Sequence, residues 1–305
     1  MRILRDPKAL QPCVLVLGMF DGVHRGHQAL LMAGLTLAEE NGLPLNVCTF
    51  EPHPMRVLRP EKAPPLLTTL TERARLMADF GVDNLCILSF SKETAAQSPE
   101  DFMAALVENY QPKHVVCGFN FTFGHRGMGN GESLRAYGQT HGFEVTIVPE
   151  VVLGGESVSS TRIRGLLEKG SIHEATRLLG HSYTLSGRVM DGKHIGRTMG
   201  YPTANVAIPQ GKVLPAFGVY ACWMQAGACI YPAVVNVGRH PTLPEGSVTV
   251  EAYALDQELS LYGQKVRLLF LDFLRPEKKF DSVEQLKQQI NRDAQEARDY
   301  FDELV

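Results

Sequence analysis

Gly18-Met19-Phe20-Asp21-Gly22-Val23-His24-Arg25-Gly26-His27 decides how the first half of the chain folds. The run follows the apolar residues 14–17 and leads into a helical pattern that continues to Asn41. Its glycines permit a tight turn and a close approach of the backbone to a ligand. The helix that follows offers free N–H groups and a positive dipole end, which together bind phosphate. We therefore expect a strand, a glycine turn and a helix start that form an anion site.

The two histidines of this run are three residues apart, so His24 and His27 can face one anion. Histidine donates hydrogen bonds to phosphate oxygens and can carry a positive charge. A metal site with His53 as third ligand is the alternative. Asp21 either braces the turn or contacts the ligand. The run lacks G-x-G-x-x-G and G-K-[ST], which excludes a Rossmann dehydrogenase or a P-loop kinase by motif.

Outward from this turn, short apolar runs alternate with helical patterns through the first half. The predicted strands are 14–17, 45–50, 85–88, 115–117 and 145–148, and the predicted helices are 27–41, 71–80, 100–110 and 132–141. Ser98, followed by Pro99 and two acids, is a plausible helix cap. Alternating strands and helices predict a doubly wound parallel α/β sheet, whose ligands bind at the carboxyl ends of the strands.

The pattern changes near Tyr183, where strand-like runs follow one another with few helices between them. These runs are 183–190, 218–224, 230–237, 248–255 and 266–274. They predict an antiparallel barrel or sandwich, closed by an amphipathic helix over about 283–300. A helical region, 168–180, is expected to join the two parts. We predict a first domain over residues 1–182 and a second over 183–305.

The composition is that of an ordinary globular protein of 305 residues, with 44% hydrophobic residues and a formal net charge of -3. This balance gives no support to a general nucleic-acid binder. No apolar run reaches the length that crosses a bilayer, and residues 1–12 lack the hydrophobic block of a secretory signal. None of the six cysteines forms a Cys-x-x-Cys pair, so we expect buried reduced thiols and a cytoplasmic location.

The run from Gly18 to His27 resembles the nucleotidyltransferase signature of the bacterial bifunctional riboflavin kinase/FAD synthetase family. Three further motifs match that family in order and spacing. They are Phe50-Glu51-Pro52-His53-Pro54, Gly118-Phe119-Asn120-Phe121-Thr122-Phe123-Gly124 and Ser159-Ser160-Thr161-Arg162-Ile163-Arg164. The resemblance implies transfer of AMP from ATP to the phosphate of FMN, with release of pyrophosphate. Such a reaction needs positioning and charge neutralisation more than a strong base.

The resemblance also suggests a role for each matching residue. His24 and His27 would hold the phosphates being separated, with Gly18, Phe20 and Asp21 in the ATP-binding turn. Ser160 and Thr161, capping a short helix, would clamp the pyrophosphate together with Arg162 or Arg164. Asn120 would hydrogen-bond phosphate or flavin, and Phe121 and Phe123 either contact flavin or pack in the core. The family often has a basic stretch after this motif, whereas residues 125–130 offer only Arg126 as a permanent charge.

The second half contains a glycine-punctuated loop after its first strand. Residues 187–205 read Gly-Arg-Val-Met-Asp-Gly-Lys-His-Ile-Gly-Arg-Thr-Met-Gly-Tyr-Pro-Thr-Ala-Asn. Backbone amides in such a loop can cradle phosphates, and the residues expected to assist are Gly192, Lys193, Gly196 and Arg197. Thr203 and Asn205 offer oxygens on one side of an extended segment, which suits Mg²⁺. A turn-rich loop with solvated charges is the alternative.

This loop is similar to the riboflavin kinase signature, which ends G-[FY]-P-T-A-N. Segments that keep the order of the family follow it, namely 218–220, 236–238, 241–242, 250–252, 261–263, 274–275 and 279–280. The resemblance implies that Thr203 and Asn205 serve the Mg-ATP site and that Glu251 is the general base. It also places Arg275 at the flavin. A base is needed because the ribityl hydroxyl of riboflavin must lose a proton as it attacks. A solvent-facing strand residue is the other interpretation of Glu251.

The leading hypothesis is a bifunctional enzyme with two ATP sites, using Mg²⁺, riboflavin and FMN and releasing FAD. A chain with one significant activity and a flavin-binding regulator without catalysis are the alternatives. We expect small-molecule substrates only, no nucleic-acid or membrane partner, and a monomer or weak self-association.

Overall fold

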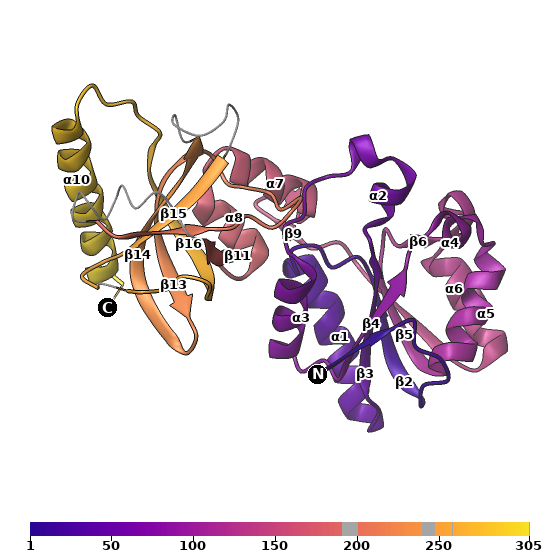
Figure 1. Ribbon diagram of the computed structural model, residues 1–305. Helices are drawn as coiled ribbons and strands as arrows, with labels where there is room; N and C mark the ends of the chain where they lie inside the picture. The colour runs from indigo at the N-terminus through magenta and orange to yellow at the C-terminus, as the bar shows by residue number, and fades with distance from the viewer. Residues whose placement is uncertain (191–200, 240–247, 258, 305) are drawn as a thin grey trace. The chain divides into compact units, whose positions relative to one another are not determined.

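The computed structural model describes residues 1–190, 201–239, 248–257 and 259–304. The chain forms two compact units, Met1–Ser160 and Thr161–Val305 (Figure 1). Within the described residues, no helix is both long and apolar enough to span a membrane.

The first unit is built on a six-stranded parallel sheet, with strand order β1-β4-β3-β2-β5-β8. The strands are β1 (Arg2–Arg5), β2 (Cys13–Leu17), β3 (Leu45–Glu51), β4 (Asn84–Ser89), β5 (Pro112–Gly118) and β8 (Glu144–Val148). The main helices are α1 (Arg25–Asn41), α3 (Leu70–Asp79), α5 (Pro99–Tyr110) and α6 (Gly131–His141). Shorter elements are α2 (Pro54–Leu58), η1 (Pro60–Lys62), α4 (Lys92–Ala96), β6 (Thr122–Phe123), η2 (His125–Gly127), β7 (Gly129–Asn130), β9 (Val152–Leu153) and β10 (Glu156–Ser157).

Both faces of this sheet are buried, because residues of β2 alternate between two hydrophobic cores. Val14 and Val16 pack with residues of α1 and α3, whereas Leu15 and Leu17 pack with residues of α5 and α6. β2 is central, with β3 on one side and β5 on the other. The order of the strands reverses at this point, and open α/β sheets bind ligands at such a switch point. The turn that follows β2 is residues 18–24.

The second unit is a closed antiparallel barrel, with strand order β11-β12-β15-β14-β13-β16. Its strands are β11 (Tyr183–Met190), β12 (Thr203–Val206), β13 (Gly218–Ala226), β14 (Cys229–Arg239), β15 (Val248–Ala254) and β16 (Lys265–Pro276). Its helices are α7 (Ser160–Glu168), α8 (Ile172–Leu179) and α10 (Val283–Asp302). α10 packs on the outside of the barrel, where Ala297 and Phe301 meet Trp223 and Leu255.

The predicted fold class is confirmed, and the second unit is a barrel rather than a sandwich. The predicted long strands and helices of both halves are present, with ends that differ by a few residues. The Ser98 cap is also confirmed, because its Oγ accepts a hydrogen bond from Asp101 N at 3.0 Å. The helical region 168–180 proves to be the end of α7, a turn, and α8. The compact units divide at Ser160, and the predicted domain boundary after residue 182 stays a prediction.

Candidate functional site

A cavity of about 960 Å³ opens at the carboxyl end of β2 in the first unit. It is lined by residues that are far apart in the sequence, from Leu17 to Ser160. Seven of the predicted site residues line it, namely Gly18, His24, His27, Asn120, Phe121, Phe123 and Ser160. The cavity is of the size of small-molecule and cofactor sites.

The two histidines stack on each other at the start of α1. Their ring centroids are 3.7 Å apart, with 18° between the ring planes. His24 is the N-cap residue of the helix, and its Nδ1 accepts a hydrogen bond from His27 N at 3.4 Å. A Cβ on Gly26 would lie 3.2 Å from the His24 ring, so glycine keeps this helix start close to the imidazole. Both rings therefore reach one wall of the cavity at the N-terminus of α1.

His27 is a neutral hydrogen-bonding group in this setting. Burial lowers the pKa of its imidazole well below the usual value, and the neighbouring His24 and Arg73 lower it further. Its Nδ1 is buried and has no hydrogen-bond partner among the described residues. The sequence suggested that the histidines can carry positive charge, whereas the structure favours a neutral His27 that donates one N–H.

Asp21 braces the turn, which was one of its two expected roles. Its carboxylate is buried and accepts hydrogen bonds from Leu67 N at 3.1 Å, from Thr68 N at 3.0 Å and from the Thr68 hydroxyl at 3.3 Å. Thr68 Oγ1 in turn accepts from Gly22 N at 2.9 Å. These bonds tie the turn to the segment that precedes α3. Contact of Asp21 with a ligand stays a prediction.

Phe20 is a core residue of the first unit, fully buried, with its ring 5.2 Å from that of His27. A Cβ on Gly18 would lie 3.0 Å from the Phe20 ring, so this glycine accommodates the phenyl group. Gly22 has a φ of 90°, where only glycine is unstrained. Phe20 and Val23 also have positive φ, at 53° and 41°. Residues with a side chain seldom adopt such values, so contacts from outside the turn must hold it in this shape.

The segment after β5 supplies another wall of the cavity. Phe123 is buried and packs 5.0 Å from the ring of Phe102, which makes it a core residue at the edge of the cavity. Phe121 is half-buried and its ring lies 5.7 Å from that of Phe123. Asn120 and Phe119 are exposed, with Phe119 54% exposed. Phe121 is therefore better placed than Phe123 to meet a planar ligand.

Ser160 is the first residue of α7, and its hydroxyl donates to the Asp21 carbonyl oxygen at 2.8 Å. This bond joins the start of α7 to the glycine turn. Thr161 is exposed, Arg162 is half-buried and Arg164 is buried. The clamp that we expect from these three residues stays a prediction.

Sequence reasoning missed the support beneath the turn. Arg73 on α3 is only 2% exposed, and its Nη1 donates to Met19 O at 3.1 Å and to Thr49 Oγ1 at 3.4 Å. Thr49 Oγ1 also donates to Met19 O, at 3.1 Å. A charged residue in a helical pattern usually indicates a solvated face, so the sequence contains no signal for this contact.

In the second unit, three polar residues lie side by side on one face of the barrel wall. Asn205 of β12 and Asn236 of β14 are both direct cross-strand partners of Glu251 on β15. The neighbours of Glu251 on its own strand, Val250 and Ala252, are buried in the barrel. Because side chains alternate along a strand, Glu251 and Asn205 face outward, together with Thr203. The expected common side of Thr203 and Asn205 is therefore present.

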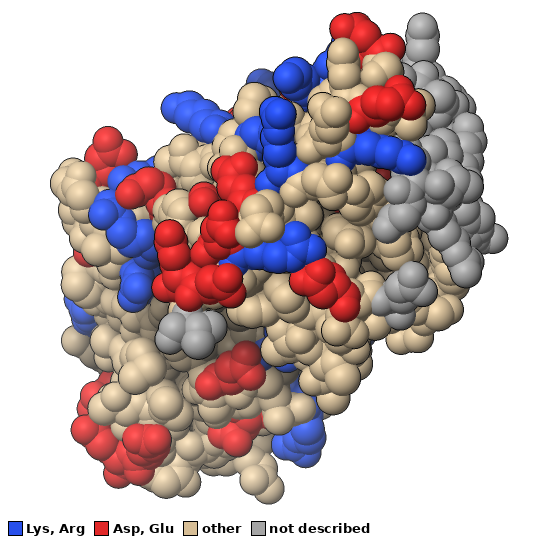
Figure 2. All heavy atoms as spheres, turned by 90° about the vertical axis from the view of Figure 1, so that its left-hand side faces the viewer, with Lys and Arg blue, Asp and Glu red and all other residues tan. Residues whose placement is uncertain are grey.

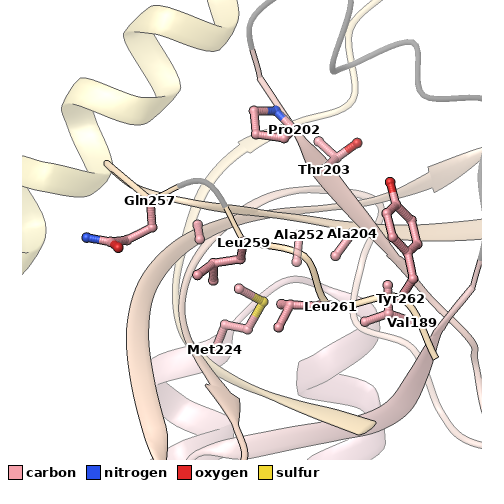
Figure 3. Close-up of a pocket in the computed structure, with 11 residues that line it drawn as sticks. Val189, Pro202, Thr203, Ala204, Met224, Ala252, Gln257, Leu259, Leu261 and Tyr262 are labelled. Atoms are coloured by element: carbon pink, nitrogen blue, oxygen red, sulfur yellow. The ribbon is translucent and has the colours of Figure 1, made fainter. Parts of the chain in front are cut away.

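A small cavity of about 30 Å³ lies between residues of β11, β12, β13 and β15 of the second unit (Figure 3). Met224, Leu261 and Ala252 line it, and the hydroxyl groups of Thr203 and Tyr262 lie on the side away from Met224 (Figure 3). This volume has room for about one water molecule.

Arg275 on β16, expected at the flavin, forms a bidentate ion pair with Asp293 on α10. The Nε–Oδ1 and Nη2–Oδ2 distances are both 2.7 Å. The contact fastens α10 to the barrel, and contact with flavin stays a prediction. Four predicted phosphate-loop residues lie outside the described residues, namely Gly192, Lys193, Gly196 and Arg197.

The metal alternative gains no support from the geometry. Among the described residues, no group of three or more His, Cys, Asp or Glu is arranged to hold a metal ion. His53 caps α2, where its Nδ1 accepts from Met55 N at 3.1 Å.

Comparison with known proteins assigns a family to this pair of units. A family model described as FAD synthetase matches residues 6–162, and one described as riboflavin kinase matches residues 179–301. An Escherichia coli K12 protein named bifunctional riboflavin kinase/FMN adenylyltransferase is 38% identical over 291 residues, 95% of this chain and 93% of the relative. The chain belongs to the bifunctional riboflavin kinase/FMN adenylyltransferase family.

A further relative and a solved structure match over a similar length. A Listeria monocytogenes protein with this name is 36% identical over 293 residues, 95% of this chain and 93% of the relative. A crystal structure described as a macrolide-efflux protein from Streptococcus pneumoniae has 33% identity and a TM-score of 0.89, and it covers 98% of this chain and 99% of that one. The bifunctional family therefore accounts for both units rather than for one of them.

Proposed function

We propose that this chain makes both flavin cofactors: it phosphorylates riboflavin to FMN with ATP, and it transfers AMP from a second ATP to FMN, giving FAD and pyrophosphate. One observation carries the proposal. Relatives with this double name match 95% of the chain, and each unit contains its own polar constellation. The first activity belongs to the barrel and the second to the parallel-sheet unit.

For adenylyl transfer, we assign phosphate binding to the wall formed by His24 and His27. The attacking group is the FMN phosphate, which is already ionised, so no base has to remove a proton. The neutral imidazole of His27, the ring of His24 and the N-terminus of α1 would stabilise the charge that moves to the leaving pyrophosphate. Ser160, Thr161 and Arg162 or Arg164 are proposed on the opposite side, and Asn120 with Phe121 at the flavin.

For the kinase reaction, we assign the general base to Glu251. The ribityl hydroxyl has to lose its proton as it attacks the terminal phosphate of ATP. The cross-strand pairing with Asn205 and Asn236 supports this role, because it places an amide side chain on each side of the carboxylate. Thr249 Oγ1 also donates to Glu251 Oε1 at 3.5 Å.

We propose Mg²⁺ as the metal of the kinase site. The hydroxyl of Thr203 and the amide oxygen of Asn205 fit this ion, which binds through few protein oxygens and keeps several waters. Mg²⁺ would neutralise the ATP phosphates when bound. The chain's own contribution is to hold the nucleotide and to accept the proton at Glu251.

We propose that small molecules are the only partners. On the face shown in Figure 2, basic and acidic side chains are interspersed, and neither sign covers the surface alone. This mixture and the net charge of -3 support the absence of nucleic-acid and anionic-membrane partners. All six cysteines are free thiols, which supports a reducing, cytoplasmic location. A monomer or weak self-association is proposed, and light scattering tests it.

A chromatographic time course with riboflavin, ATP and Mg²⁺ tests the proposal. FMN that appears and then gives way to FAD is the expected result. Glu251→Gln should abolish FMN formation while FAD still forms from supplied FMN, and His27→Ala should do the reverse. FMN without FAD would restrict the function to the kinase. Loss of both activities in either folded variant would contradict separate sites.

A further inference from the structure

Arg73 is the most deeply buried arginine among the described residues and lies beneath the glycine turn rather than at the cavity wall. It comes from α3, whose N-terminus is fixed by a capping box between Thr69 and Glu72. Its Nη1 contacts Met19 O, so one charged side chain from a separate helix holds the backbone of the turn. Its Nε is buried and has no hydrogen-bond partner among the described residues.

Arg73 is both deeply buried and positively charged. Burial lowers the pKa of the guanidinium, while Asp21 and Glu51 oppose this shift, so the group stays a cation. Burying a cation is costly unless it is paired and hydrogen-bonded. Arg73 donates to Met19 O, and its charge lowers the pKa of the neighbouring His27 imidazole.

The turn requires support from outside. Phe20 and Val23 both have positive φ, a conformation that persists only where surrounding contacts impose it. Met19 O, next to Phe20, accepts hydrogen bonds from both Arg73 and Thr49. Two donors on one carbonyl fix the direction in which the chain leaves β2, and hence the place of His24 and His27.

We propose that Arg73 is a positioning residue for FAD synthesis: through the Met19 carbonyl it fixes the turn that presents the two histidines to the phosphates. This inference rests on the proposed adenylyl transfer. Arg73 acts through the turn and need not touch a substrate. One guanidinium nitrogen, Nη1, donates to both Met19 O and Thr49 Oγ1. The rigid planar group fixes the direction of this nitrogen, which a lysine amine on a flexible stem does less well.

The experiment compares Arg73→Met and Arg73→Lys with Arg75→Met, a matched control at an exposed position of the same helix. The measured quantity is kcat/KM for FAD formation from FMN and ATP. Riboflavin phosphorylation by the barrel of the same molecule serves as the internal control. We expect Arg73→Met to lose about 100-fold, mainly in kcat, as for a misplaced catalytic group. Arg73→Lys should retain part of the activity, and Arg75→Met should equal the unchanged protein.

A second readout separates positioning from a merely structural role. The charged and titratable groups that face His27 are His24 and Arg73, while Asp21 and Glu51 face Arg73. Removing the positive charge of Arg73 should raise the pKa of His27, which an NMR titration of the labelled imidazole measures. Arg73→Lys keeps the charge and should leave that pKa close to its original value.

The outcomes are distinct. If the unchanged protein makes FMN but no FAD, the proposed function of the first unit fails. If it makes FAD and a folded Arg73→Met equals the Arg75→Met control, the positioning role is overturned. Should Arg73→Met not fold, Arg73→Lys and Thr49→Val decide, because each weakens the hold on Met19 O. Full FAD synthesis in both variants would also overturn the role.

Discussion

Replacing Asp21 by asparagine tests whether this carboxylate braces the turn. The two carboxylate oxygens accept hydrogen bonds from Leu67 N, Thr68 N and the Thr68 hydroxyl. Asparagine has one acceptor oxygen, so one buried backbone N–H would face an NH₂ group without a partner. An unsatisfied buried donor costs about 1–3 kcal/mol, and the loss of charge-assisted bonds adds to it. We expect Asp21→Asn to destabilise the first unit by about 3 kcal/mol.

The assay must report on each unit separately, because a two-unit chain has no single unfolding free energy. Hydrogen exchange followed by mass spectrometry can read the amides of β2 and α3, where a loss of about 3 kcal/mol is roughly a 100-fold loss of protection. Trp223, the single tryptophan, packs in the barrel at 4.5 Å from the Phe301 ring and reports the second unit by fluorescence. Asp79→Asn, at an exposed position of α3, is the control. Unchanged protection in Asp21→Asn would refute the bracing role.

Two further predictions concern titration and thiol chemistry. The pKa of His27 is lowered in the folded protein, whereas in the unfolded chain it returns to about 6.5, so the unfolded state binds more protons at acidic pH. The first unit should therefore keep this stability above pH 6.5 and lose up to about 1.4 kcal/mol per pH unit below it. Exchange at several pH values should show this slope, and a folded His27→Gln variant should lack it. Five of the six cysteines are buried, and burial raises the pKa of Cys13 and Cys86 to about 12, so a thiol reagent should modify one equivalent quickly, at exposed Cys229. Fast modification of two or more thiols in the native protein would contradict this burial.

Most of the fold could be predicted because its elements carry strong local signals. β2 is an unbroken buried apolar run, and α5 begins at a serine followed by proline and two acids. β1 was missed because Arg2–Arg5 is a polar edge strand with only β4 beside it. β12 was read as an extended segment, since its four residues, Thr203–Val206, are too few to show the periodicity of a strand.

The sequence predicted those residues of the candidate site that belong to a motif. The stacking of His24 on His27 follows from their spacing on a helix start. The contact of Arg73 with Met19 joins residues 54 positions apart, and the sequence gives no sign of it. The ion pair of Arg275 with Asp293 could not be predicted either, because it depends on how α10 packs on the barrel. Motifs identify the groups that meet a substrate, whereas the groups that hold them in place emerge only from the packing.

The supports of the turn come from several elements of the chain. Asp21 binds the segment before α3, Met19 is held from α3 and β3, and the start of α7 reaches the turn through Ser160. A turn with two residues at positive φ cannot hold this shape by itself. The phosphate wall thus exists only when β2, β3 and α3 are folded together. It follows that substitutions of the α3 residues that hold the turn, such as Arg73→Met, should reduce FAD synthesis before they unfold the sheet, while riboflavin phosphorylation in the barrel continues.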